Sequence, residues 1–247
     1  LLCNIHNNVF YSCTKRLLTS SCFSMRKCCR NIIISKESCH FFCDICGAEN
    51  VTALCVFYGQ KHSREMAAAR KVAAYYGVRL LEQDIAGIMS YSNCSLLAAS
   101  SEAIEHKSYA QQLAEHGEGT VATYVPFRNG LLISAAAAIA ISLGADAICY
   151  GAHADDAAGR AYPDCTPEFY AAMDTAIYEG SGKLCHLEAP LLNKNKAQIV
   201  ELGLNLGAPY QYTWSCYEGG DRPCGECGTC IDRANAFKAN GVDDPAL

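Results

Sequence analysis

The sequence predicts an α/β protein built on a doubly wound parallel sheet, with a small metal-binding segment near the C-terminus. From Gly47 onward, short apolar runs alternate with longer segments of helical periodicity. Such alternation is typical of a parallel sheet covered by helices on both faces. The predicted helices that end at residues 76, 143 and 206 are each followed directly by a glycine, at Gly77, Gly144 and Gly207, and glycine is common at helix C-termini. In sheets of this kind, ligands bind beyond the carboxyl ends of the strands.

Four segments are predicted to be strands. The clearest is a continuous apolar run at residues 51–57, which has the length and character of a strand buried on both faces. In chain order the predicted strands are Val51–Phe57, Val78–Asp84, Ala145–Gly151 and His186–Leu191.

Five segments are predicted to be helices. Segment 63–76 carries its apolar side chains on one face, whereas segment 128–143 is apolar nearly all round and is expected to be buried. In chain order the predicted helices are Ser63–Tyr76, Arg128–Leu143, Pro167–Glu179, Asn195–Leu206 and Cys230–Asn240. Residues 85–120 mix polar and small side chains, so we expect an irregular excursion with some helix around Tyr109–Ala114. The segment His153–Cys165, rich in Asp, Gly and Pro, is expected to be a loop.

The first 46 residues differ in composition from the rest of the chain. They carry six basic and two acidic side chains in a protein whose net charge is −5, and they hold eight of its 17 cysteines. Apart from the short run Ile32–Ile34, they show no apolar pattern. We therefore predict that residues 1–46 are an aberrant segment, disordered or mistranslated. Residues 47–247 are predicted to form one α/β domain that includes the cysteine segment 215–231.

Composition argues against several classes of protein. A net charge of −5 gives no support for a nucleic-acid surface. The segment Leu131–Leu143 comes nearest to a membrane span, but it is shorter than the roughly 18 residues required and contains two serines. No continuous apolar region of a secretory signal is evident. We therefore expect a cytoplasmic protein that binds neither nucleic acid nor membranes.

Four cysteines near the C-terminus follow the pattern C-x7-C-x2-C-x2-C. They are Cys216, Cys224, Cys227 and Cys230. Four thiolates at this spacing can enclose one tetrahedral zinc ion and leave no position for water, so the ion is expected to be structural. An iron–sulfur cluster and unmetallated cysteines are the alternatives, although the bacterial ferredoxin pattern places its fourth cysteine downstream in a Cys-Pro pair. Arg222 and Arg233 are close enough in sequence to offset the thiolate charge.

Two basic residues stand at the starts of predicted helices. Arg128 opens the helix 128–143, where a cation opposes the helix macrodipole unless an anion binds there. A helix N-terminus with an arginine makes a good phosphate site, and a solvated arginine is the alternative. Lys196, near the start of the helix 195–206, could also meet phosphate, with a surface lysine as the alternative.

Three aspartates lie in the loop that follows the third predicted strand. Asp155, Asp156 and Asp164 offer paired carboxylates that could hold Mg2+ or accept the N–H donors of a purine-like base. A solvated, turn-forming acidic loop explains the same residues equally well.

Several motifs occur together, in one order along the chain. They are Tyr-Gly-Gln-Lys-His at 58–62 with Glu65, Val-Pro-Phe-Arg-Asn at 125–129, Tyr-Pro-Asp-Cys at 162–165, and the four-cysteine pattern. The combination resembles the 7-cyano-7-deazaguanine synthase family of the queuosine pathway, in the ATP-pyrophosphatase (PP-loop) superfamily, over residues 47–240. The resemblance implies a sheet of the adenine-nucleotide alpha hydrolase type.

The resemblance also implies an activity. A ligase of this family adenylates 7-carboxy-7-deazaguanine with ATP and Mg2+, and ammonia then displaces AMP to give an amide. A second ATP drives dehydration of the amide to the nitrile. The four cysteines would hold structural zinc, and a homodimer is expected. The residues implied as catalytic are Arg128, Lys196 and Asp156, and those implied at the nucleotide or substrate are Tyr58, Gln60, His62, Glu65, Asn129 and Asp164.

One family motif is missing from the sequence. Family members carry Ser-Gly-Gly-x-Asp-Ser after the first strand, where backbone amides hold pyrophosphate at a helix start, and none of the 247 residues reproduces it. Asn31–Ser35 could imitate the strand, but Lys36-Glu37-Ser38 follows where the glycines belong. Two hypotheses therefore stand: a synthase whose N-terminus is garbled, and a non-catalytic, zinc-stabilised remnant or interaction module. A PP-loop tRNA-thiolating ligase is weaker, because no basic tRNA surface is evident.

Overall fold

The fold is organised around a five-stranded sheet. A computed structural model describes residues 31–33, 47–117 and 119–246 of the chain. Every pair of neighbouring strands is parallel, and the strand order is β3-β2-β1-β4-β5. The strands are β1 (Asn31–Ile33), β2 (Val51–Phe57), β3 (Arg79–Asp84), β4 (Ala147–Cys149) and β5 (His186–Glu188).

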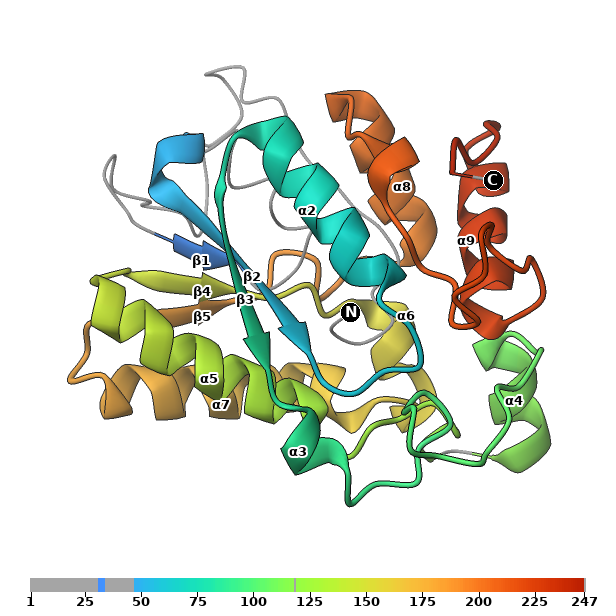
Figure 1. Cartoon of the computed structure of the whole chain (residues 1–247), viewed down its shortest axis with the longest axis horizontal. Helices are drawn as coiled ribbons and strands as arrows, with labels where there is room; N and C mark the ends of the chain where they lie inside the picture. Colours follow the sequence, from blue (N-terminus) through green and yellow to red (C-terminus); the bar gives the residue numbers. More distant parts are fainter. Residues whose placement is uncertain (1–30, 34–46, 118, 247) are drawn as a thin grey trace.

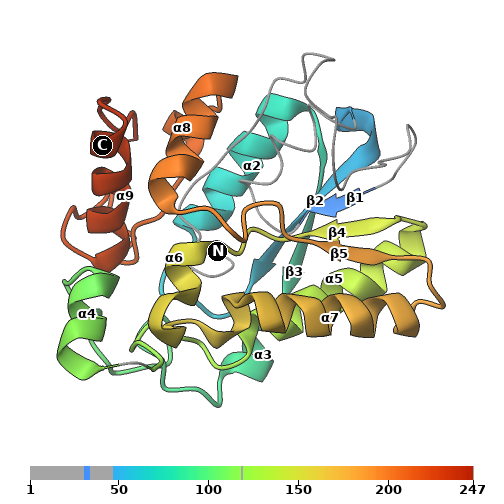
Figure 2. The same ribbon diagram turned by 180° about the vertical axis from the view of Figure 1, so that it is seen from behind.

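Helices cover both faces of this sheet (Figures 1 and 2). Helices α2 (Arg64–Tyr76) and α8 (Lys196–Leu206) lie on one face, and α5 (Arg128–Leu143) and α7 (Pro167–Gly180) lie on the other. The predicted α/β class and the doubly wound parallel sheet are confirmed. The shorter helices are α3 (Ala86–Met89), α4 (Tyr109–His116), α6 (Ala154–Ala157) and α9 (Gly228–Ala239).

Strand β1 lies within the first 46 residues, whose composition differs from that of the rest of the chain. Asn31–Ile33 pair with Val51–Ala53 of β2 on one side and with Ala147–Cys149 of β4 on the other. These three residues therefore occupy the centre of the sheet, and the change of composition at Gly47 is not the edge of the fold. The prediction that residues 1–46 form an aberrant segment therefore fails for residues 31–33. Its remainder concerns residues 1–30 and 34–46, which lie outside the described part of the chain, and there it stays a prediction.

The main core lies between α5 and the sheet. The prediction that this helix is buried holds for one face only, because Ile141 and Leu143 are exposed. Four apolar α5 side chains on the other face are fully buried: Leu132, Ile133, Ala136 and Ala140. They pack with Ile148 of β4 and with Tyr150, which follows it. A fully buried Leu or Ile side chain contributes about 1.5–3 kcal/mol. Gly144 ends the helix at φ +67°, a left-handed conformation that glycine adopts without steric cost.

Three strands are shorter than the sequence predicts, β3 by one residue and β4 and β5 by more. β4 and β5 each have three residues, because β4 pairs over three residues with β1 on one side and with β5 on the other. The loop expected at 153–165 contains α6 and the 3-10 turns Ala158–Arg160 and Pro163–Cys165. In the irregular excursion, α4 begins with a capping box between Ser108 and Gln111.

The C-terminal segment forms a separate layer at one end of the sheet. Helix α9 lies beside α8, and α4 lies close to the start of α9 (Figure 1). Among the helices of the described residues, none combines the length and the hydropathy that crossing a bilayer requires.

Candidate active site and metal centre

The candidate site lies where the strand order reverses. β2 and β3 follow on one side of β1, and β4 and β5 follow on the other. In open α/β sheets, ligands bind at such a switch point, outside the carboxyl ends of the strands. The loop after β4 meets the starts of α5 and α8 at this edge, through contacts of Asn129 with Asp164 and of Lys196 with Asp155. Residues 34–46, which follow β1 in the sequence, lie outside the described residues.

Arg128, the first residue of α5, is buried. It is 2% exposed, and its guanidinium carbon lies 5.0 Å from the centre of the Tyr58 ring. Its Nε has no hydrogen-bond partner among the described residues. Burial opposes the positive charge, but the oxygens of Tyr58 and Asp164 outweigh this effect and raise the pKa of Arg128 above its ordinary value. The alternative of a solvated arginine is therefore wrong, and a buried cation faces the switch point.

Asp164 binds the start of the same helix. Its Oδ2 accepts a hydrogen bond from the backbone N–H of Asn129 at 2.9 Å, and the Asn129 side-chain amide donates to the Asp164 carbonyl at 3.2 Å. Burial raises the pKa of Asp164, and Arg128 partly opposes that rise. The anion expected at this helix start is thus supplied in part by the protein itself. Asp164 Oδ1 has no partner among the described residues. We call Tyr58, Arg128, Asn129 and Asp164 the Arg128 cluster.

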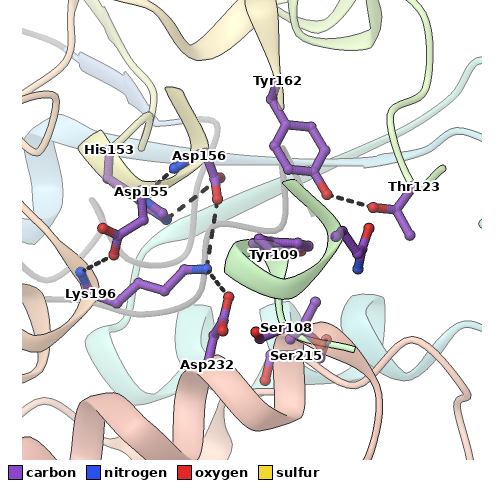
Figure 3. A network of polar contacts seen from close by, with 12 residues as sticks. Ser108, Tyr109, Thr123, His153, Asp155, Asp156, Tyr162, Lys196, Ser215 and Asp232 are labelled. Atoms are coloured by element: carbon purple, nitrogen blue, oxygen red, sulfur yellow. Dashed lines mark hydrogen bonds and ion pairs between the residues drawn. The ribbon is translucent and has the colours of Figure 1, made fainter. Parts of the chain in front are cut away.

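Lys196, the first residue of α8, is also buried, at 4% exposed. Its Nζ lies 2.9 Å from Asp232 Oδ2, 3.8 Å from Asp156 Oδ1 and 4.4 Å from the centre of the Tyr109 ring (Figure 3). Its backbone N–H donates to Asp155 Oδ2 at 2.7 Å. The surface-lysine alternative is therefore wrong. We call Tyr109, Asp156, Lys196 and Asp232 the Lys196 cluster.

Asp156 is the least solvated carboxyl group of the Lys196 cluster. It is 0% exposed, and neither of its oxygens accepts a hydrogen bond from a described residue. Burial raises its pKa to about 7, although the nearby Lys196 ammonium works against the rise. His153 Nε2 lies 3.5 Å from Asp156 Oδ2, and burial together with Lys196 holds the pKa of His153 well below its ordinary value. A solvated acidic loop is excluded for Asp156 and Asp164, since both are buried.

Buried tyrosines join the two clusters, and sequence reasoning missed most of them. The hydroxyls of Tyr109 and Tyr217 are 2.6 Å apart, and those of Tyr162 and Thr123 are also 2.6 Å apart. The Tyr109 and Tyr162 rings meet edge to face at 5.6 Å. Burial raises the pKa of Tyr162, so this hydroxyl is neutral.

Tyr58, Gln60 and Glu65 are fixed by one another. The Gln60 side-chain oxygen accepts from the Tyr58 N–H at 2.9 Å, and its amide lies 3.5 Å from Glu65 Oε2. All three side chains are buried. His62 instead lies against the cysteine segment, because its ring is so close to Gly219 that a Cβ there would come within 2.3 Å of it. The predicted roles of these residues toward a nucleotide stay predictions.

The four cysteines of the C-terminal motif meet in space. The Sγ atoms of Cys216, Cys224, Cys227 and Cys230 all lie within 4.8 Å of one another, and two of them are 3.9 Å apart. With Zn–S distances of 2.3 Å, the sulfurs of a tetrahedral site are about 3.8 Å apart. The Cys224 and Cys227 N–H groups and the Glu226 N–H donate to these sulfurs at 3.3–3.4 Å. The donor set therefore fits one structural metal ion.

Arg233 was predicted to offset the charge of the thiolates, but in the structure its guanidinium pairs with a carboxylate. The Arg233 guanidinium donates to both carboxylate oxygens of Asp244, with Nη2 2.7 Å from Oδ1, and Nη1 donates to Thr213 at 2.8 Å. Both members of the ion pair are buried. Backbone N–H groups around the sulfurs, rather than this guanidinium, are the donors seen at the metal centre.

Two functional candidates carry no local sequence signal. Asp232 reaches Lys196 from another helix, 36 positions along the chain. Tyr150 is fully buried, and its hydroxyl has no partner among the described residues. Only its place at the carboxyl end of the predicted strand 145–151 could have marked Tyr150, because strand ends are where ligands bind in such sheets.

Comparisons with known proteins agree on one family. The sequence profile of the queuosine biosynthesis protein QueC family matches residues 38–241, so the likeness begins before Gly47. A protein of Archaeoglobus fulgidus is 45% identical over 202 residues, which are 81% of each chain. One of Thermoplasma acidophilum is 41% identical over 79% of this chain and 80% of its own, and one of Marinobacter nauticus is 40% identical over 79% and 84%. All three carry the name 7-cyano-7-deazaguanine synthase.

Proposed function

The chain belongs to the QueC family of queuosine biosynthesis proteins, and we propose that its site is that of a 7-cyano-7-deazaguanine synthase. In this proposal the site takes 7-carboxy-7-deazaguanine, ATP and ammonia and produces the nitrile. The reaction forms a carbon–nitrogen bond at the expense of ATP, so the protein would be a ligase.

One observation carries the proposal: buried charged side chains lie together at the switch point, and several of their polar atoms have no hydrogen-bond partner among the described residues. Arg128 Nε, Asp164 Oδ1 and both Asp156 oxygens have no hydrogen-bond partner among the described residues, and all three residues are nearly or fully buried. Leaving such groups unsatisfied is costly in a folded protein. A ligand that is both anionic and rich in N–H donors would satisfy both kinds of group. A nucleotide together with a deazapurine acid has both properties.

The proposed chemistry assigns charge-stabilising work to the two buried cations. The substrate carboxylate attacks the α-phosphorus of ATP, and pyrophosphate leaves. Arg128 and Lys196 would stabilise the negative charge that develops on the α-phosphate. Ammonia then attacks the acyl carbon and AMP leaves, giving the amide. The amide oxygen is adenylated by a second ATP, and loss of AMP and a proton forms the nitrile.

The acidic residues would serve recognition and proton transfer. Asp164 Oδ1 is available to accept an N–H of the deazapurine ring. Asp156 has a pKa of about 7, which suits a group that takes a proton from the incoming nitrogen near neutral pH. If Asp156 instead holds the Mg2+ that is bound with ATP, it would not act as the proton acceptor, and the ion would supply further charge neutralisation at the phosphates.

Zinc is the metal that we propose for the C-terminal centre. Four sulfur donors suit zinc, and a closed four-coordinate site has no open position for catalysis. An iron–sulfur cluster binds its cysteines to several separate iron atoms, which spreads the sulfurs more widely than one shared ion does. The mutual proximity of the four sulfurs favours the single ion.

The second candidate function is a catalytically impaired remnant. It is favoured by the absence of Ser-Gly-Gly-x-Asp-Ser from the 247 residues, because that loop would hold the pyrophosphate. If the loop is indispensable, this chain binds zinc but turns over little or no ATP.

The two candidates differ in an assay of AMP release from ATP with 7-carboxy-7-deazaguanine and an ammonium salt. The synthase releases AMP only when the acid is present and yields the nitrile by mass spectrometry, and Arg128→Ala reduces kcat/KM by about 100-fold. Arg70→Ala, which removes an exposed arginine, is the matched control and retains activity. Release of AMP that is indifferent to Arg128 would refute the assigned site. No release, with zinc bound, identifies the remnant.

A further inference from the structure

We infer that Asp232 is a positioning residue for Lys196, and that the metal-bound segment thereby sets the geometry of the proposed reacting centre. The inference rests on the proposed function only where it concerns catalysis. The coupling between the metal centre and the lysine is a property of the fold.

The Lys196 side chain is held from several sides. Asp155 accepts its backbone N–H, and the ammonium lies 2.9 Å from Asp232 but 3.8 Å from Asp156. Of these two carboxylates, only that of Asp232 is within hydrogen-bond distance of Nζ. The Tyr109 ring lies 4.4 Å from Nζ (Figure 3), and a cation over an aromatic face is held in place by the ring quadrupole.

Asp232 is fixed by the metal centre. Cys227 is the N-cap residue of α9, and Cys230 lies in its first turn. Asp232 follows two residues later, a rise of about 3 Å along the helix axis. An ion that binds both cysteines therefore fixes the end of the helix from which Asp232 projects. Without the ion, the first turn of α9 loses its attachment to Cys216 and Cys224.

The same helix start also fixes the aromatic ring above Lys196. A Cβ on Gly228 would come within 2.7 Å of the Lys107 carbonyl oxygen and 3.4 Å of the Tyr109 ring. Because glycine lacks that atom, α9 can approach the start of α4 closely. Both side chains that hold the ammonium, Asp232 and Tyr109, thus depend on where the metal places the first turn of α9.

The arrangement has a consequence for the reaction. Asp232 holds Nζ outside hydrogen-bond distance of Asp156, so the Asp156 carboxylate is left available for substrate. If the ion pair with Asp232 is lost, the Lys196 ammonium is expected to pair with Asp156 instead. It would then lie further from the phosphate that it would stabilise. Misplacing a positioning group by about 1 Å can reduce a rate by about 100-fold.

Asp232→Asn tests the inference because it removes the charge and keeps the shape. We expect the 15N signal of the Lys196 ammonium, assigned with Lys196→Arg, to shift in Asp232→Asn. Bound zinc and Tm should be unchanged. Asp221→Asn is the matched control: it removes a fully exposed aspartate of the same segment, and the lysine signal should not move.

Kinetics adds a readout that a merely structural role would not produce. Asp232→Asn is expected to lower kcat about 10-fold while KM for ATP changes less than twofold, because only the placement of the lysine is altered. Asp232→Glu should restore part of the loss. A lysine signal that is identical in wild type and Asp232→Asn would overturn the inference whatever the activity. A shifted signal with no turnover in any variant would instead count against the proposed function and leave the coupling intact.

Discussion

The two polar clusters at the switch point are built in different ways. The Arg128 cluster comes from the ends of β2 and α5 and from the loop after β4, all of which belong to the sheet and its covering helices. The Lys196 cluster combines residues of α6 and α8 with Tyr109 of α4 and Asp232 of α9. Half of its members therefore come from the layer beside the metal centre. Sheet topology alone positions the first cluster, whereas the second also depends on the segment that carries the four cysteines.

The difference follows from how each region is stabilised. The sheet buries a large apolar cluster that includes the inner face of α5, and apolar burial needs no cofactor. Around the cysteines, the buried cluster is smaller and three of the four sulfurs are among its buried members. This region also contains irregular backbone between Tyr212 and Cys227. It lacks the ladders of hydrogen bonds that stabilise a sheet, so we expect it to depend on the ion.

Replacing a metal ligand should have the largest effect of all. Cys227→Ala is expected to abolish metal binding and to destabilise the protein by at least about 5 kcal/mol, or about 10 °C in Tm. Elemental analysis and thermal unfolding measure both. Cys185→Ala is the matched control, because Cys185 is equally buried but lies outside the metal set. It should retain the ion and lose only about 1–2 kcal/mol.

Hydrogen exchange on Cys227→Ala separates the two clusters. We expect amide protection to fall in α9 and α4 and to persist in α5, since the sheet keeps its own core. Uniform loss of protection in all of these helices would show that the metal supports the whole fold, and the contrast between the clusters would then be wrong.

The sequence predicts the sheet-based region better than the metal-based one. The bounds of β2 and α5 were predicted without error, because β2 is a short apolar run and α5 is mostly apolar and ends at a glycine. The four cysteines were found because zinc ligands keep a recognisable spacing. These features are encoded within a few consecutive residues, and the structure confirms them.

Long-range pairings explain what the sequence did not predict. Lys196 was open to interpretation as a surface lysine, because the aspartate that pairs with its ammonium is on a different helix. Arg233 was placed near the thiolates by sequence distance, but its partner Asp244 lies eleven positions further on. The central strand β1 has only three residues, and the sequence marked it only as a possible imitation of a strand at Asn31–Ser35. Its identity depends on pairing with β2 and β4.

The pH dependence of stability tests the Lys196 cluster directly. Burial raises the Asp156 pKa from 3.8 to about 7, so the folded state binds an extra proton between these values and stability falls as pH rises through them. Asp156→Asn removes this dependence. The difference in free energy of unfolding between the variant and wild type should therefore change by about 3 kcal/mol in favour of the variant from pH 5 to pH 8. Urea unfolding without ligand measures it. Activity should be lost, because the carboxylate is part of the proposed site. If the stability difference between variant and wild type were equal at both pH values, the claim that Asp156 is buried with a raised pKa would be wrong.

Two arginine–carboxylate pairs with the same geometry refine the comparison further. Arg233 bonds both oxygens of Asp244 in the C-terminal layer, and Arg70 bonds both oxygens of Glu82 between α2 and β3, at 2.6 and 2.9 Å. Asp244→Ala leaves a guanidinium buried without its carboxylate and is expected to cost about 3 kcal/mol.

Glu82→Ala should change Tm too little to resolve, because Arg70 is exposed and water replaces the lost partner. The exposed pair is thus the control for the buried one: both pair an arginine with a carboxylate in the same bidentate geometry, and they differ mainly in burial. Thermal unfolding of both variants, each with its zinc content measured, decides the matter. If Asp244→Ala were as mild as Glu82→Ala, the C-terminal layer would not depend on its buried ion pair, and the metal alone would account for its stability.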